Sequence, residues 1–233
     1  MREPSLDFLL DGFREGILRA LRGDPQVLSA ARVTLQVSLG STLLAAVLGL
    51  PVGYVLATKR FRGRGWAIAL CQTLLGLPTV VVGLLVYGFL SRRGPLGFLD
   101  LLFAPGAIVV GLVILITPVL VVFAMTALAS LDTRARETAL TLGASARLAA
   151  WTLVLEARFG LLAAVLAAFG RAASEVGLAM ILGGNIEGYT RTLTTAVALE
   201  SMKGEFGFGI ALGVVLMIIV LATNMLIRLL QRT

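Results

Sequence analysis

The chain has 233 residues, of which 58% are hydrophobic and 14% charged, and its mean hydropathy of +0.96 is typical of an integral membrane protein rather than a soluble domain. In such a chain the formal net charge of +7 is first a signal of membrane topology, and it gives little support to a nucleic-acid partner. With no histidine and a single cysteine, Cys71, the sequence supports no zinc, haem or iron–sulfur site, no Cys–His nucleophile and no disulfide within the chain.

The first 26 residues are predicted to form a separate amphipathic segment. Apolar residues recur at helical spacing between positions 5 and 22, with charged residues on the other side, which indicates a helix lying in the membrane interface. Gly23 and Pro25 are expected to end it. The same charges argue against a cleavable signal peptide. We therefore divide the chain into an amphipathic segment, 1–26, and a transmembrane domain, 27–233.

Five membrane spans are predicted, because a helix that crosses the hydrocarbon needs about 20 mostly apolar residues. Uncharged runs give four of them, and the fourth in chain order contains only Arg171 and Glu175 as charges. Lysine and arginine in the connecting loops place the C-terminus and the loop 132–158 in the cytoplasm. The predicted spans are 33–58, 65–91, 101–131, 159–186 and 206–227.

A polar insert at 132–158 separates the third and fourth spans. Asp132 is a candidate N-cap for a short charged helix, Gly143 occupies the position expected for a left-handed residue after it, and Ser145 can cap a following helix. Periodicity alone favours an ordinary solvated helix. The alternative is a rigid helix through which a separate motor protein moves the two attached spans.

The sequence contains no nucleotide site that could serve as such a motor. A P-loop requires Gly-Lys-Ser/Thr after a glycine-rich turn, whereas the two lysines, Lys59 and Lys203, follow Thr58 and Met202. Energy from ATP would therefore have to enter from another polypeptide.

Arg171 and Glu175 lie four positions apart near the middle of the fourth predicted span. An unpaired charge at the bilayer centre costs at least about 2.5–3.5 kcal/mol, so the two side chains are expected to pair and to face the interior of the bundle. The pair is either a neutralised packing contact or part of an anion pathway or gate, and both interpretations stay open.

The stretch 182–206 begins with Gly183 and Gly184, which end the helix, and is too polar and irregular to face lipid. It is expected to line a cavity or to pack against protein, although a solvated outer loop explains any single residue equally well. Its hydroxyl and guanidinium donors suit a tetrahedral oxyanion. They are Thr190, Arg191, Thr192, Thr194 and Thr195.

The insert resembles the EAA loop of ABC importer permeases, in which Glu, a small residue and Ala precede a Gly at fixed spacing. Glu137, Ala139 and Gly143 match this order, whereas Thr138 replaces the usual Ala and Glu156 replaces a later Pro. The resemblance implies that this helix docks into a nucleotide-binding subunit. The residues implied in that coupling are Arg136, Glu137, Thr138, Ala139, Leu142, Gly143 and Ala144.

Residues 169–200 resemble the molybdate, sulfate and tungstate branch of these permeases through Arg171, Glu175, Gly177, Gly184 and Asn185. Within that branch the runs 76–87, 91–97 and 185–195 are most similar to tungstate permeases. The candidate residues for the translocation pathway or gate are Arg171, Glu175, Asn185, Thr190, Arg191 and Thr194.

The resemblance implies an all-α, multi-pass protein of a prokaryotic cell membrane with the type I ABC importer (MetI-like) permease fold. It implies a homodimer that is surrounded by membrane lipid and transports an oxyanion. Tungstate is the first candidate for this oxyanion, and molybdate or sulfate is the alternative. The resemblance also implies that this chain has no enzymatic activity and no cofactor. ATP and Mg²⁺ would bind to separate ATPase subunits inside, and a solute-binding protein would dock outside. A stand-alone secondary anion transporter or channel would explain the Arg171–Glu175 pair but not the insert, and an intramembrane enzyme would lack a nucleophile–base pair.

Overall fold

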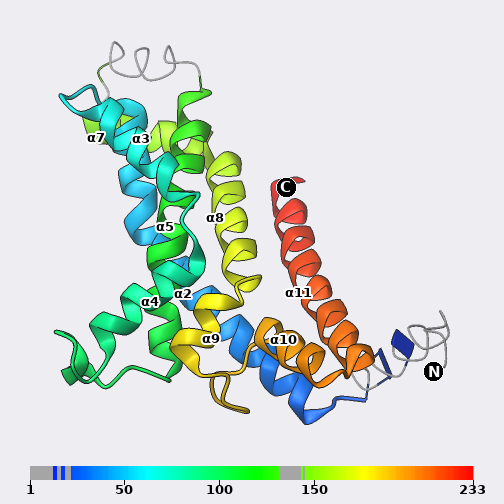
Figure 1. The fold of residues 1–233 in the computed structure, drawn as a ribbon. Helices are drawn as coiled ribbons and strands as arrows, with labels where there is room; N and C mark the ends of the chain where they lie inside the picture. The colour runs from blue at the N-terminus through cyan, green and yellow to red at the C-terminus, as the bar shows by residue number, and fades with distance from the viewer. Residues whose placement is uncertain (1–12, 15–16, 19–21, 132–142, 144, 233) are drawn as a thin grey trace.

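The computed structural model describes residues 13–14, 17–18, 22–131, 143 and 145–232 (Figure 1). These residues fold into helices joined by short connections, so the all-α prediction is confirmed, while most of the segment 1–26 lies outside the described residues. In chain order the elements are α2 Pro25–Thr58, α3 Arg64–Leu74, α4 Thr79–Leu90, the 3-10 turn η1 Gly97–Leu99, α5 Pro105–Ala129, α7 Ala146–Glu156, α8 Arg158–Ala173, α9 Gly177–Gly183, α10 Leu193–Lys203 and α11 Phe206–Arg232.

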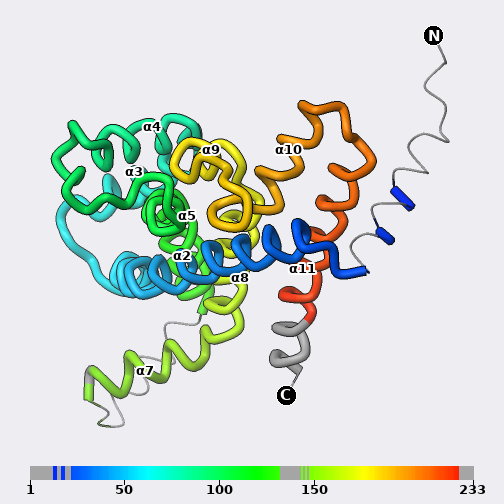
Figure 2. Tube along the Cα trace, turned by 90° about the horizontal axis from the view of Figure 1, so that it is seen from below, coloured from blue at the N-terminus to red at the C-terminus, as the bar shows by residue number. Residues whose placement is uncertain are grey.

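Three helices, α2, α5 and α11, are each long and apolar enough to cross a membrane. The number rises to five if each of two bent pairs, α3 with α4 and α7 with α8, counts as one crossing. In Figure 1, α2, α5 and α8 run along the length of the molecule, and Figure 2 shows α4, α9 and α10 next to one another across one end. The connection from α2 to α3 lies at the opposite end, with α7.

The main core forms where α2 packs on α5, and glycine allows the two backbones to approach closely. A Cβ atom added at Gly53 would lie 2.9 Å from both the Cβ of Ala124 and the backbone oxygen of Val121. Small residues serve this purpose in membranes, where helix association depends on packing contact rather than on the exclusion of water.

Replacement of Gly53 by alanine is therefore expected to lower the free energy of unfolding by about 1–3 kcal/mol, because the added methyl group meets backbone that has no room to move. The measurement is the unfolding midpoint of the purified chain in detergent. Gly40→Ala is the matched control, since its nearest atom, the Cγ2 of Val109, is 3.9 Å away. Equal losses in the two variants would show that the α2–α5 approach does not limit stability.

The second predicted span, residues 65–91, is not one helix. α3 ends at Leu74, α4 begins at Thr79, and the two axes differ by 100°. Pro78 stands immediately before α4, where it lacks the N–H needed to continue a helix and disfavours the helical conformation of Leu77. The predicted span at 65–91 is therefore a bent pair of helices, and it counts as one crossing only with this bend.

The fourth predicted span, residues 159–186, is also interrupted. α8 ends at Ala173 and α9 starts at Gly177 after a three-residue break. α9 packs on α4, where a Cβ atom added at Gly83 would lie 3.3 Å from the Cα of Leu178. The prediction of a continuous helix was wrong because the direction of α9 depends on this contact with a distant part of the chain.

A further helix, α10, occupies part of the stretch that was predicted to be irregular. Thr192 and Thr195 form a reciprocal capping box at its start, and Gly204 ends it in the left-handed conformation, at φ +84°. α10 packs against α11 and contributes Leu193 and Ala196 to a second buried apolar cluster. The helix is therefore stabilised from both ends and by one apolar face, although its sequence is too polar for a membrane span.

Candidate functional site

The Arg171–Glu175 pair lies at the break between α8 and α9. Arg171 is in the last turn of α8, where a cation interacts favourably with the helix dipole. Its Nη1 donates a hydrogen bond to Glu175 Oε2 over 2.8 Å. The predicted contact is confirmed, although it is made at a helix end rather than within a continuous helix.

Glu175 is buried, and both of its carboxylate oxygens have partners. Oε2 accepts from Arg171, and Oε1 accepts from the backbone N–H of Leu178 in α9 over 3.1 Å. The backbone oxygen of Glu175 accepts from the hydroxyl of Thr194 in α10 over 2.7 Å. A buried carboxylate requires this degree of pairing. Glu175 thereby joins α8, α9 and α10 at a single point.

Arg171 differs from Glu175 in that 36% of its side chain is exposed. A guanidinium offers five N–H donors, and among the described residues only its Nη1 has a partner, Glu175. The remaining donors are available to an external acceptor. The arrangement thus presents a fixed positive charge whose orientation is set by a buried acid.

The threonine hydroxyls of the following stretch are engaged within the protein. Thr190 is fully buried, donates to the carbonyl of Gly183 over 2.6 Å and accepts from the N–H of Ile186 over 2.9 Å. Thr192 and Thr195 cap the start of α10. These hydroxyls close turns and helix ends, so they are not free donors for an oxyanion in this structure.

Replacement of Thr190 by valine is expected to destabilise the protein by about 1–3 kcal/mol, because the part-buried N–H of Ile186 and the carbonyl of Gly183 both lose this partner. Thermal unfolding in detergent measures the change. Thr126→Val is the matched control, since that exposed hydroxyl only donates to the carbonyl of Val122 within its own helix. A Thr190→Val midpoint equal to that of Thr126→Val would contradict the structural role.

Arg191 and Asn185 form a second polar group, on the loop after α9. Arg191 Nη1 contacts Glu187 Oε2 at 3.0 Å, and its Nη2 donates to the backbone oxygen of Asn185 over 3.4 Å. Glu187 also accepts from Gln26 over 3.0 Å, which ties the loop to the start of α2. Arg191 Nε and Asn185 Oδ1 are buried without a hydrogen-bond partner among the described residues. The loop therefore retains one unpaired donor and one unpaired acceptor.

Arg171 and Arg191 do not contact each other in the structure. The Arg171–Glu175 pair precedes α9 and the Asn185–Arg191 loop follows it, and a helix of this length rises about 10 Å. Thr194 connects the two regions, because it lies in the first turn of α10 and bonds to Glu175. The candidate site thus consists of two polar centres at the two ends of α9.

Most residues predicted to couple to an ATPase lie outside the described residues, namely Arg136, Glu137, Thr138, Ala139, Leu142 and Ala144. Gly143 is described, and its φ of +85° confirms the predicted left-handed conformation. Ser145 accepts from the N–H of Leu148 over 3.3 Å and caps α7, as predicted. Within the part of the chain that the structure describes, a Cβ atom added at Gly143 would find no atom within 4 Å.

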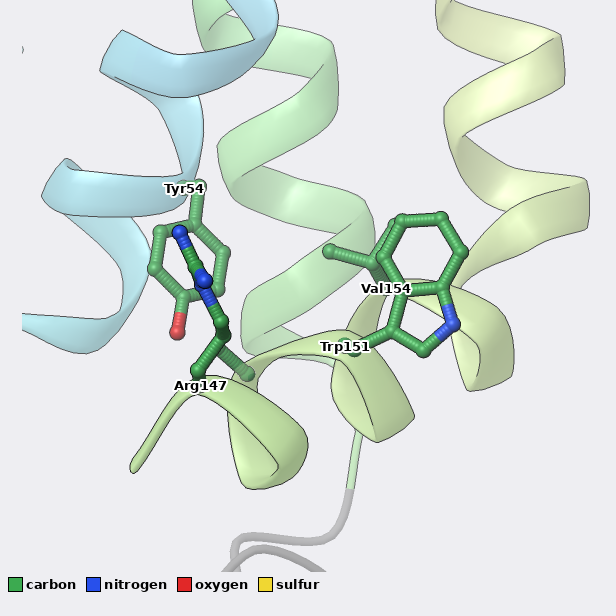
Figure 3. A pocket seen from close by; sticks show the side chains of 5 residues that line it. Tyr54, Arg147, Trp151 and Val154 are labelled. Carbon is green, nitrogen blue, oxygen red and sulfur yellow. The ribbon is translucent and has the colours of Figure 1, made fainter. Parts of the chain in front are cut away.

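A cavity of about 470 Å³ that the sequence did not indicate lies between the end of α2 and α7. In Figure 3 the Arg147 side chain of α7 lies beside Tyr54 of α2, whereas Trp151 projects from α7 on the side away from Tyr54. Among the described residues, Arg147 is the only charged one that lines the cavity, whose walls are otherwise largely apolar. Its lining residues are Tyr54, Arg147, Ala150, Trp151 and Val154.

Comparison with known proteins relates the chain to membrane transport. Residues 49–233 match the family described as the binding-protein-dependent transport system inner membrane component. A probable anion ABC transporter permease protein of Haloferax volcanii is 42% identical over 205 residues, which cover 86% of this chain and 88% of that protein. The tungstate uptake system permease protein TupB of Campylobacter jejuni is 38% identical over 228 residues, covering 98% and 95%.

A solved structure supports the fold. A chain of a bacterial alginate ABC transporter, crystallised in complex with an alginate pentasaccharide-bound periplasmic protein, matches with a TM-score of 0.70 and 17% sequence identity. The match covers 99% of this chain and 91% of that chain. At this identity the likeness concerns the helical arrangement alone.

Proposed function

The chain belongs to the family of binding-protein-dependent transport system inner membrane components, and on that premise we propose that it forms the membrane pathway of an ATP-driven importer for an oxyanion. It is a transport component and a multi-pass membrane protein rather than an enzyme. The observation that carries the proposal is similarity along nearly the whole chain to a tungstate uptake permease. Tungstate is the first candidate cargo, ahead of molybdate and sulfate, whose permeases are more distant relatives.

The proposed assembly is a homodimer in a prokaryotic plasma membrane, with the pathway along its two-fold axis. ATPase subunits that bind ATP and Mg²⁺ act through the insert at 132–158, since the sequence has no P-loop of its own. A solute-binding protein delivers the anion to the outer end. The periplasmic protein bound to the structurally similar alginate transporter supports a partner of this kind.

Arg171 is the proposed contact for the anion within the pathway. Its partly exposed guanidinium has free donors, and Glu175 holds it in place. In a homodimer two copies would offer two guanidinium groups to the oxyanion, and these groups suit its oxygens because they donate in a planar fork. Glu175 keeps each site neutral while it is empty.

The proposal is tested by reconstituting the chain into liposomes with its ATPase and its solute-binding protein, and by following the uptake of labelled tungstate with molybdate and sulfate as competitors. Uptake is expected to require ATP and all three proteins. Uptake by the chain alone, driven by an ion gradient, would instead identify a secondary transporter.

A further inference from the structure

A groove between α2 and α3, distinct from the candidate site, opens at the end of the molecule that carries α7. It has a volume of about 400 Å³, and apolar atoms form its entire exposed wall. Several lining side chains are substantially exposed, among them Val55 and Leu70, so nothing in the described part of the chain covers the groove. It is lined by Pro51, Val52, Val55, Leu56, Phe61, Ala67, Leu70 and Cys71.

The mouth of the groove carries a dense positive charge. Phe61, one of the lining residues, lies in the connection between the two helices and is flanked by Arg60 and Arg62, with Lys59 one position earlier. All three cationic residues are exposed, and within the described part of the chain none of them takes part in an ion pair or a side-chain hydrogen bond. Apolar walls and unpaired cations therefore meet in one short connection.

The connection is held in a defined shape. Arg64 Nε donates to the carbonyl of Leu56 over 2.7 Å, a bond that satisfies an otherwise free oxygen in the last turn of α2. Gly63 adopts the left-handed conformation at φ +89° and starts α3. The cations are thus presented beside the groove by an ordered turn, which lowers the entropy lost on binding a ligand.

We propose that this groove binds an anionic phospholipid of the cytoplasmic leaflet, with an acyl chain against α2 and α3 and the headgroup phosphate at Lys59, Arg60 and Arg62. Basic pockets beside membrane helices on the cytoplasmic side have the chemistry that such headgroups require. Trp66, in the first turn of α3, is 84% exposed, as expected for an aromatic residue at the level of the headgroups.

Two other occupants fit the observations less well. A second copy of the chain, packed here about a two-fold axis, would bring its own Lys59, Arg60 and Arg62 against the same residues, and like charges at an interface repel. A water-soluble ATPase would have to extend apolar surface into a groove that runs alongside the membrane span α2.

The test uses the full chain in nanodiscs of phosphatidylcholine with a small fraction of phosphatidylglycerol that carries a photoreactive group on one acyl chain. Adducts are expected on peptides of α2 and α3, in preference to adducts from a matching phosphatidylcholine probe. Each cation near an anionic headgroup contributes about 1 kcal/mol, so Arg60→Gln with Arg62→Gln is expected to raise the half-saturating fraction of phosphatidylglycerol about 30-fold.

The matched control is Arg92→Gln with Arg93→Gln, two adjacent exposed arginines beyond the end of α4, which should leave the labelling of the groove unchanged. Equal labelling by both probes, or equal effects of the two double variants, would overturn the proposal. Cys71 is the only cysteine and lines the groove, so a short thiol crosslink between two copies would identify a second copy as the occupant and would also overturn it. Lipid labelling requires no transport, so this result is independent of the proposed cargo.

Discussion

Replacement of Gly143 by leucine is expected to lower ATP-driven uptake at least tenfold, while the subunit still inserts and keeps its unfolding midpoint. Gly143 has a φ of +85°, a conformation that costs a residue with a side chain about 1–2 kcal/mol. No atom of the described residues lies within 4 Å of the position that its Cβ would take, so the strain is relieved by backbone rotation rather than by a clash. We expect such a rotation to weaken the proposed engagement of the insert by ATPase subunits.

The chain contains a matched control for this experiment. Gly63 has a φ of +89°, also has no described atom within 4 Å of its Cβ position, and lies in the connection between α2 and α3, which Figure 1 shows at the end that carries α7. Gly63→Leu introduces equivalent strain outside the insert, so ATP-driven uptake should persist. If Gly143→Leu transports normally, the insert is not the coupling element, and if both variants fail, backbone strain alone explains the loss.

The features predicted correctly from the sequence depend on residues that are close together in the chain. The Arg171–Glu175 contact follows from their spacing of four residues. The left-handed conformation of Gly143 and the cap that Ser145 forms on α7 follow from the chemistry of helix ends. The long apolar helices α2, α5 and α11 follow from the absence of charge over about 20 residues. In each case the deciding interaction lies within one helix or one turn.

The break between α8 and α9 and the two hollows beside α2 were missed because they depend on contacts between distant segments. α9 leaves the direction of α8 because it packs against Gly83 of α4, and no local signal marks that contact. The helix α10 was missed for another reason: the capping box of Thr192 and Thr195 was a usable signal, but the polarity of the stretch indicated an irregular segment that lines a cavity or packs against protein. The cavity between α2 and α7 and the groove between α2 and α3 each have walls from two helices, so they form only when the chain folds.

The threonines of the candidate site show that a sequence does not indicate which hydroxyls the fold already uses. Their hydroxyls have the right chemistry for an oxyanion, yet Thr190 and Thr194 bond to the backbone oxygens of Gly183 and Glu175. A sequence shows which groups can donate, whereas only the fold shows which donors are already used. The partly exposed guanidinium of Arg171 still has donors available, because Glu175 bonds to just one of its nitrogens.

Removal of the Arg171 side chain alone is expected to lower the stability of the protein substantially. Arg171→Ala leaves the carboxylate of Glu175 buried with only the Leu178 N–H, and breaking a buried ion pair in this way costs about 3–5 kcal/mol, less here because Arg171 is partly exposed. In Arg171→Leu with Glu175→Gln the charge is gone, and the glutamine oxygen can still accept from Leu178. This double variant should recover most of the stability, which thermal unfolding measures.

Transport separates the two interpretations of the pair. If Arg171 contacts the anion, the stable double variant should still lose uptake by at least about tenfold, since a charge-assisted hydrogen bond contributes about 1.5–3 kcal/mol. The pair Lys203–Glu200 in α10 is a matched control, because its 2.8 Å contact also joins an exposed cation to a mostly buried acid. Lys203→Leu with Glu200→Gln should transport normally. Normal uptake by both double variants would reduce Arg171 and Glu175 to a packing contact, because a pathway that needs a fixed positive charge cannot work after its removal.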